Sequence, residues 1–256
     1  MREVTLAGHK VRLYQSIEEL PMQRFHKYNK CLMIDAGLGS DMVAMDGHLE
    51  RVVQYIRNER KEEAAKEIEN IRQTMYLILQ EQSPKHLSFA CLVESIDGKP
   101  VDDVSDDGLK HILELLGDVP VGEVTAQSDA VKKKIDEELM MYFPQLFESN
   151  SEKEFYDIIK ERTQAMLRCI LEGDTEENKQ KVDRLTGEMV MFAKPLSFNG
   201  QNNTEVEYDR RYEDMCLVMS QELHINMKKC TVMEYYNAYQ FLQKQRKGSE
   251  RQNKAH

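Results

Sequence analysis

Residues 40–82 read SDMVAMDGHLERVVQYIRNERKEEAAKEIENIRQTMYLILQEQ, and this stretch decides the expected fold. Apolar side chains recur in it at three- and four-residue spacing in two runs, which is the period of a helix with one apolar stripe. Ser40 stands at the N-cap position of the first helix, with Asp41 in its first turn. Because each helix has one stripe to bury and the connection is short, we expect the two helices to pair through these stripes as an antiparallel hairpin. The stripes are Met42, Met45, Leu49, Val52, Val53 and Ile56 on the first helix, and Ala64, Ile68, Ile71, Met75, Ile78 and Leu79 on the second.

The rest of the chain is expected to be helical apart from its beginning. Apolar and polar side chains alternate around Ala7-Gly8-His9, which predicts a small β-hairpin in residues 3–14. This hairpin can dock on the helices or pair with another chain. Elsewhere capping patterns recur before apolar runs, such as Thr231 with Glu234. We therefore predict an all-α fold of stacked helical hairpins with a small N-terminal β-hairpin.

The periodicity also suggests how the chain is divided. Pro144 and Ser149-Asn150 interrupt the helical pattern and predict a soft boundary there. The predicted parts are the β-hairpin (1–15), a helical domain with the central hairpin 40–82 (16–148), a second helical layer (149–243) and a basic flexible tail (244–256).

Composition excludes several classes of protein. The 256 residues carry a formal net charge of −10, which argues against a nucleic-acid partner because binding phosphates needs clustered Lys and Arg. The five cysteines form no CxxC pair, which is typical of reduced thiols in the cytoplasm and gives no zinc site. There is no apolar run of transmembrane length and no signal-peptide pattern, so we expect no membrane association.

One acidic stretch could bind a metal. Residues 103–108, DVSDDG, followed by Glu114, match the start of an EF-hand calcium loop. Against this, Lys110 stands where the loop needs an apolar residue, and Ser105 followed by two acids is equally typical of a helix start. A metal-dependent enzyme or calcium-responsive module using the acidic loop 97–114 is therefore the alternative function. The ligands would be Asp103, Ser105, Asp107 and Glu114.

Other catalytic patterns are incomplete. His48-Leu49-Glu50 has the HxE spacing of zinc deaminases, but no PCxxC follows it. No nucleophile, base and orienting group can be argued from spacing, and there is no phosphate-binding glycine motif. We therefore expect a non-enzymatic protein without a cofactor.

The last helix offers a candidate interface. Its apolar face is rich in tyrosine, a residue enriched where proteins meet because it buries area and keeps a polar handle. The other interpretation is that this face packs on the core of the same chain. The predicted interface residues are Val232, Tyr235, Tyr236, Tyr239 and Leu242.

Three stretches carry a resemblance to a known group of proteins. They are IEELP at 17–21, LMIDAGLGSD at 32–41 and TVMEYYNAY at 231–239. Together they resemble structural-module proteins of phages and prophages from gut Bacteroidales. The last stretch is also similar in style to the C-terminal helices of tail assembly chaperones, small helical proteins that coat a tape-measure protein before the tail tube polymerises.

The resemblance implies a phage-type assembly or structural protein that acts through protein–protein contacts. The expected partners are virion or tail proteins or further copies of the chain, and the expected location is the bacterial host cytoplasm or the virion. This chain is longer than a typical tail assembly chaperone, which leaves a neck or tail component as another role.

Overall fold

The computed structural model describes residues 1–81, 83–117, 119, 121–147, 150–173, 175–192 and 194–253. Helices dominate the chain, so the predicted mostly-α class is confirmed. They are α1 (Met22–Gly37), α2 (Met42–Arg57), α3 (Lys61–Leu79), α4 (Pro84–Leu92), α5 (Asp106–Leu116), α6 (Val121–Tyr142), α7 (Asn150–Glu172), α8 (Glu176–Phe192), α9 (Thr204–Leu223) and α10 (Val232–Asn253). Short 3₁₀ turns follow α6 and α9 at Pro144–Phe147 and Met227–Lys229.

The predicted N-terminal β-hairpin is confirmed and belongs to a larger sheet. Its strands are β1 (Arg2–Leu6) and β2 (His9–Leu13), and β2 pairs in turn with β3 (Val93–Ile96), which pairs with β4 (Lys99–Pro100). All neighbours are antiparallel, in the order β1-β2-β3-β4. The β3–β4 turn is Asp97-Gly98, with both residues at positive φ as a two-residue hairpin turn requires. The sequence predicts an acidic loop from residue 97 onward, whereas in the structure this stretch begins with a second hairpin.

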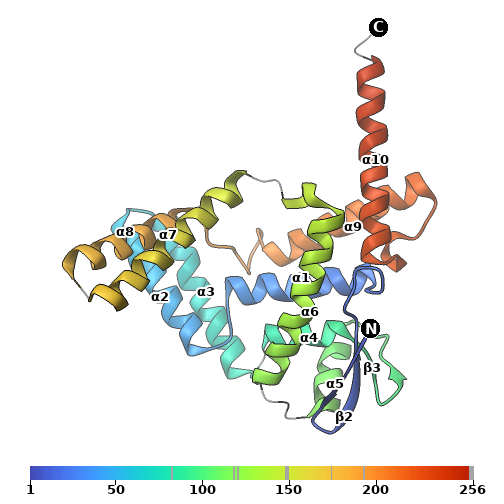
Figure 1. Ribbon diagram of the computed structural model, residues 1–256, viewed down its shortest axis with the longest axis horizontal. Coiled ribbons are helices and arrows are strands. Elements are labelled where there is room, and N and C mark those ends of the chain that lie inside the picture. Colours follow the sequence, from blue (N-terminus) through green and yellow to red (C-terminus); the bar gives the residue numbers. More distant parts are fainter. Residues whose placement is uncertain are drawn as a thin grey trace.

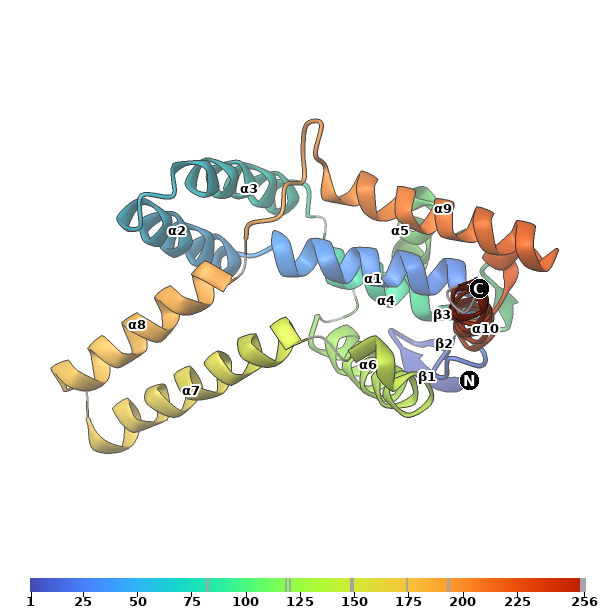
Figure 2. The same ribbon diagram turned by 90° about the horizontal axis from the view of Figure 1, so that it is seen from above.

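The main core surrounds α1. This helix packs against α4, with α9 on one side and α6 on the other (Figure 2). Fully buried side chains such as Leu13, Phe89, Ile112 and Met219 come from the sheet and from α4, α5 and α9. The core therefore draws on both predicted helical ranges, 16–148 and 149–243. The predicted boundary at 148–149 lies outside the described residues.

Two helical hairpins lie at the C-terminal end of α1, away from the sheet, α5 and α10 (Figure 1). They are α2–α3 and α7–α8, and none of their described side chains belongs to the core around α1. The predicted pairing of the helices within residues 40–82 is confirmed. Asp41 rather than Ser40 is the N-cap, because its Oδ1 accepts a hydrogen bond from the backbone N–H of Ala44 at 2.8 Å.

Helix α10 is longer than the sequence analysis suggested. A tail was expected from residue 244, but the helix runs on to Asn253 and extends beyond the body of the molecule (Figure 1). The segment KQRKGSERQN contains no proline and is rich in Lys, Arg, Gln and Glu, residues that favour helices. The segment expected as a tail from residue 244 is therefore helical as far as Asn253.

Candidate interaction surface

The apolar stripes of α2 and α3 face outward, contrary to the prediction that they pack against each other. Ile56 is 61% exposed and Leu79 is 75% exposed. Four further stripe residues, Met45, Val52, Ile71 and Ile78, are only half-buried. We call the exposed stripe side chains the hairpin face: Met42, Leu49, Val53, Ile56, Ile68, Met75 and Leu79.

A cluster of polar side chains occupies the inside of this hairpin, beside the buried Tyr55 and the one buried stripe residue, Ala64. His48 and Glu67 are each 1% exposed, and their Nδ1 and Oε1 atoms lie 2.8 Å apart. Asn70 donates to the other oxygen of Glu67 at 3.2 Å, and Nε of Arg51 donates to Oε1. The carboxylate thus has partners on both helices, and it links α2 to α3 across the hairpin.

The same polar side chains attach the hairpin to the rest of the protein. The carbonyl oxygen of Leu38, the C-cap of α1, accepts hydrogen bonds from Nε2 of His48 and from Oγ1 of Thr74, both at 2.8 Å. Because a carbonyl oxygen can only accept, Nε2 of His48 carries a proton. Asn70 also donates to the carbonyl of Leu196 at 3.0 Å. The carbonyl group that α1 leaves without a partner inside the helix is therefore hydrogen-bonded by side chains of two other helices, α2 and α3.

The segment that carries Leu196 lies close to the end of α1. A Cβ atom at Gly37 would lie 2.4 Å from the ring of Phe198, so only glycine allows this ring to pack there. Gly39, next to the C-cap, has φ +67°, which ends the helix and turns the chain into α2. Gly39 therefore ends α1, and Gly37 makes room for the ring of Phe198.

The electrostatics of the cluster favour a charged carboxylate. Burial alone would raise the pKa of Glu67, but the hydrogen bonds from His48 and Arg51 outweigh it and lower this pKa below its ordinary value. A buried charge with three donors is stabilised, whereas the same charge without them would be costly. The cluster therefore fixes the rotation of both helices, and this rotation leaves the stripes outside.

The α7–α8 hairpin shows a related pattern. Ala165 and Leu185 are buried, one on each helix, while Leu167, Ile170 and Leu171 are exposed near the end of α7. The two peripheral hairpins thus both present apolar side chains on their outer surfaces. Contiguous exposed apolar surface on a folded protein is typical of interaction sites.

The interface predicted on α10 is largely internal. Val232, Tyr235 and Leu242 are buried in the core around α1, so a partner cannot reach them in this conformation. Tyr236 and Tyr239 are half-buried, and the Tyr236 ring lies 5.3 Å from that of Phe143. The physical reason is the helical aromatic stripe itself, which buries its apolar area against α1, α9 and the Phe143 ring that follows α6.

The start of α10 follows the predicted capping box. Oγ1 of Thr231 accepts from the N–H of Glu234 at 3.3 Å, and Oε2 of Glu234 accepts from the N–H of Thr231 at 2.8 Å. This reciprocal pair satisfies two backbone donors at the beginning of the helix.

The acidic loop forms a helix start. Ser105 is the N-cap of α5 and accepts from the N–H of Gly108 at 3.1 Å, while Oδ1 of Asp103 accepts from the N–H of Ser105. Asp107 lies in the first turn, and Glu114 lies 3.5 Å from His111 on the same helix. In the part of the chain that the structure describes, no three His, Cys, Asp or Glu side chains are grouped to hold a metal ion. The alternative ligand set Asp103, Ser105, Asp107 and Glu114 is thus not assembled.

Comparisons with protein-family models, with curated proteins and with solved structures gave no match to this chain. No helix within the described ranges is both long and apolar enough to cross a membrane.

Proposed function

We propose that this chain is a non-enzymatic assembly protein that acts through protein–protein contacts, with the hairpin face as its contact surface. The observation that carries this proposal is the inverted α2–α3 hairpin. Its buried side holds the hydrogen-bonded polar cluster beside Tyr55 and Ala64, whereas the seven apolar side chains of the hairpin face are exposed. Exposed apolar side chains have no hydrogen bonds to water that a partner would break, and they gain from leaving water.

The occupant that fits this face is a second copy of the chain. With 16 residues, α2 is about 24 Å long. Two helices about 10 Å apart present a face roughly 20 Å wide. Each copy thus offers about 500 Å², and two copies reach the total of about 1,000 Å² that a specific interface needs.

The charges beside the stripe suit an antiparallel pair. Asp46 and Glu50 are exposed in the first half of α2, and Arg57 is exposed at its end. A twofold axis that aligns two copies of α2 in opposite directions sets the acidic half of one against the basic end of the other. The stacked helical hairpins expected from the sequence would then form between copies.

The resemblance of residues 17–21, 32–41 and 231–239 to phage structural-module proteins supports a place for this assembly in phage particles. Under this proposal the protein is of the tail-assembly-chaperone type, works in the host cytoplasm and has virion or tail proteins as further partners. Co-purification with the product of a neighbouring structural gene tests that narrower claim. If no such product is retained, the phage role fails while self-association remains open to test.

Light scattering coupled to size-exclusion chromatography tests self-association directly. We expect the wild-type chain to elute as a dimer or larger species and the double variant Leu49→Lys with Ile56→Lys to elute as a monomer. The matched control is Leu167→Lys with Ile170→Lys, which places the same charges on exposed positions of α7. Both variants should change the free energy of unfolding of the monomer by less than about 1 kcal/mol, because the replaced side chains are exposed.

A wild-type monomer at concentrations of about 50 µM would contradict the proposal, since this is well above the dissociation constants of specific dimers. Equal loss of association in the α7 control would assign the contact to the other hairpin instead. Retention of the dimer in the α2 variant would also contradict it.

A further inference from the structure

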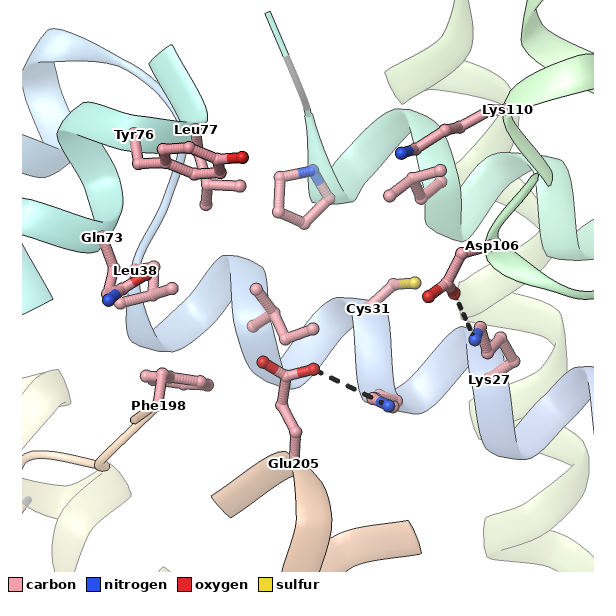
Figure 3. A pocket seen from close by; sticks show the side chains of 14 residues that line it. Lys27, Cys31, Leu38, Gln73, Tyr76, Leu77, Asp106, Lys110, Phe198 and Glu205 are labelled. Atoms are coloured by element: carbon pink, nitrogen blue, oxygen red, sulfur yellow. Dashed lines mark ion pairs between the residues drawn. The ribbon is translucent and has the colours of Figure 1, made fainter. Parts of the chain in front are cut away.

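A pocket separate from the hairpin face lies beside α1. Its walls come from α1, α3, α4, α5 and α9 and from Phe198, and it encloses a cavity of about 250 Å³ (Figure 3). At about 30 Å³ for each water-sized group, the pocket has room for roughly eight such groups. This volume suits a small organic molecule or the side chain and carboxylate of one amino-acid residue.

Much of the wall is apolar. Side chains that line the pocket without a polar group are Ile34, Leu38, Leu77, Pro84, Leu87 and Phe198. Leu38 and Phe198 belong to the contacts that hold the end of α1 in place, so this wall is supported by the surrounding fold. An apolar wall with a few polar groups is the usual composition of a small-ligand site.

Three lysines line the pocket, and two of them are paired. Nζ of Lys27 lies 2.5 Å from Asp106, and Nζ of Lys30 lies 2.7 Å from Asp209 and 3.7 Å from Glu205.

The third lysine is Lys110, and among the described residues no carboxylate lies within ion-pair distance of its Nζ. Figure 3 shows its ammonium group and the hydroxyl of Tyr76 directed toward one another across the pocket. Besides Lys27, Lys110 contributes to the lowered pKa of Asp106, but within the described part of the chain its ammonium group makes no direct ion pair.

We propose that this pocket binds a small apolar carboxylate, with its head group on Lys110 and Tyr76 and its body on the apolar wall. Lys27 pairs with Asp106, and Lys30 pairs with Asp209 and Glu205, so Lys110 is the lysine of the lining that has no ion pair among the described residues. One such ammonium group suits a monoanion better than a phosphate dianion. A charge-assisted hydrogen bond to the ammonium and a second donor from the phenol would fix the head group. The same chemistry is offered by a free organic acid and by the C-terminal residue of a peptide.

Calorimetric titration of the full chain tests this proposal with two probes. The first is phenylacetate, with phenylacetamide as its neutral counterpart. The second is a tetrapeptide ending in leucine, with its C-terminal amide as the counterpart. We expect at least one acid to bind with a dissociation constant of about 1 mM or tighter, and its amide to bind at least tenfold more weakly. Which acid binds identifies the source of the carboxylate.

Variants locate the binding site. Lys110→Met should weaken the acid by about tenfold or more, because it removes the unpaired charge while keeping the chain length. Lys133→Met is the control, since Lys133 is also exposed but lies on α6 outside the pocket. Alkylation of Cys31, whose thiol lines the pocket, should slow when the acid is bound, whereas alkylation of Cys169 on α7 should not change.

Three results would overturn the proposal. The first is that neither acid binds. The second is that acid and amide bind equally well, or that Lys110→Met binds the acid as the wild type does. The third is that inorganic phosphate displaces the acid at equal concentration, which would indicate a site for dianions. None of these results bears on the hairpin face, because no residue of that face lines the pocket.

Discussion

The helix pair α1–α4 and the helix pair α2–α3 differ in the kind of side chain that is buried between their helices. Between α1 and α4 most buried side chains are apolar, among them Phe25, Tyr28 and Phe89, and the buried Arg24 donates to the carbonyl of Cys91 at 3.2 Å. Between α2 and α3 the buried side chains are His48, Glu67 and further polar groups together with Tyr55 and Ala64, and the other stripe residues are exposed or half-buried. The same helical period therefore produces two different surfaces, one closed on itself and one open to a partner.

The difference follows from what each interior needs. Apolar burial is non-directional and roughly proportional to area, so α1 and α4 can bury any side chain of suitable volume. Hydrogen bonds require matched donors and acceptors at fixed geometry, so the α2–α3 interior specifies position more strictly than it contributes stability. A hairpin held in this way can keep its apolar stripes for another use.

Loss of volume in the apolar interior should have the largest effect. Phe89 is fully buried on α4, and Phe89→Ala should lower the free energy of unfolding by about 4 kcal/mol through lost transfer energy and the cavity left behind. Denaturant unfolding followed by circular dichroism measures this. The control is Phe241→Ala on α10, where the ring is 53% exposed and the expected loss is below about 1 kcal/mol. Similar losses in the two variants would contradict the description of α4 as core.

The sequence predicted the elements better than their orientation. Helical period and capping residues located the hairpin 40–82, the start of α5 at Ser105 and the start of α10 at Thr231, because these signals are local. The helical periodicity shows which residues share a face of a helix, but it does not show which face packs against the rest of the protein. The stripes were therefore identified correctly and assigned to the wrong side.

The polar interior depends on contacts between distant parts of the chain. His48 and Glu67 meet only in the observed register of the hairpin, and Asn70 reaches a carbonyl at residue 196. A local signal did exist. His48 with Tyr55 and Glu67 with Thr74 repeat at seven residues, so each pair shares a helix face beside the apolar stripe. The Asp97-Gly98 turn was an equally available signal for the hairpin that was missed.

Removal of the central carboxylate should have the next largest effect. Glu67→Ala leaves His48, Arg51 and Asn70 without their shared acceptor, and the expected loss is about 3 kcal/mol. The matched control is Glu69→Ala on the same helix, whose exposed pair with Arg72 should contribute less than about 0.5 kcal/mol. Hydrogen exchange should show faster opening in α2 and α3 than in α1.

An equal loss in the Glu69 variant would mean that helix propensity rather than the cluster holds the hairpin. If Glu67→Ala accelerated exchange in α1 and α4 as much as in α2 and α3, the two interiors would form one cooperative unit. The two helix pairs would then differ in the residues they bury but not in how they unfold.

The pH dependence of the same carboxyl should give the smallest effect and the most specific one. The folded state lowers the pKa of Glu67 below its ordinary value of 4.5, so the unfolded chain binds the proton more tightly. Stability from this group is therefore complete above the unfolded pKa and is lost as pH falls toward the folded pKa. The difference in free energy of unfolding between wild type and Glu67→Gln should narrow as the pH is lowered below about 4.5.

Asp35 on α1 supplies a control of opposite sign. Burial raises its pKa above the ordinary value of 3.8 although Lys85 opposes this, so its folded state binds the proton more tightly than the unfolded chain. The free energy of unfolding of the wild type should accordingly increase relative to that of Asp35→Asn as the pH falls below about 4.5. Parallel curves for the two variants would mean that Glu67 gains nothing from His48 and Arg51. Curves of opposite slope would show that a charged carboxylate, rather than its volume, holds the hairpin with its apolar face outward.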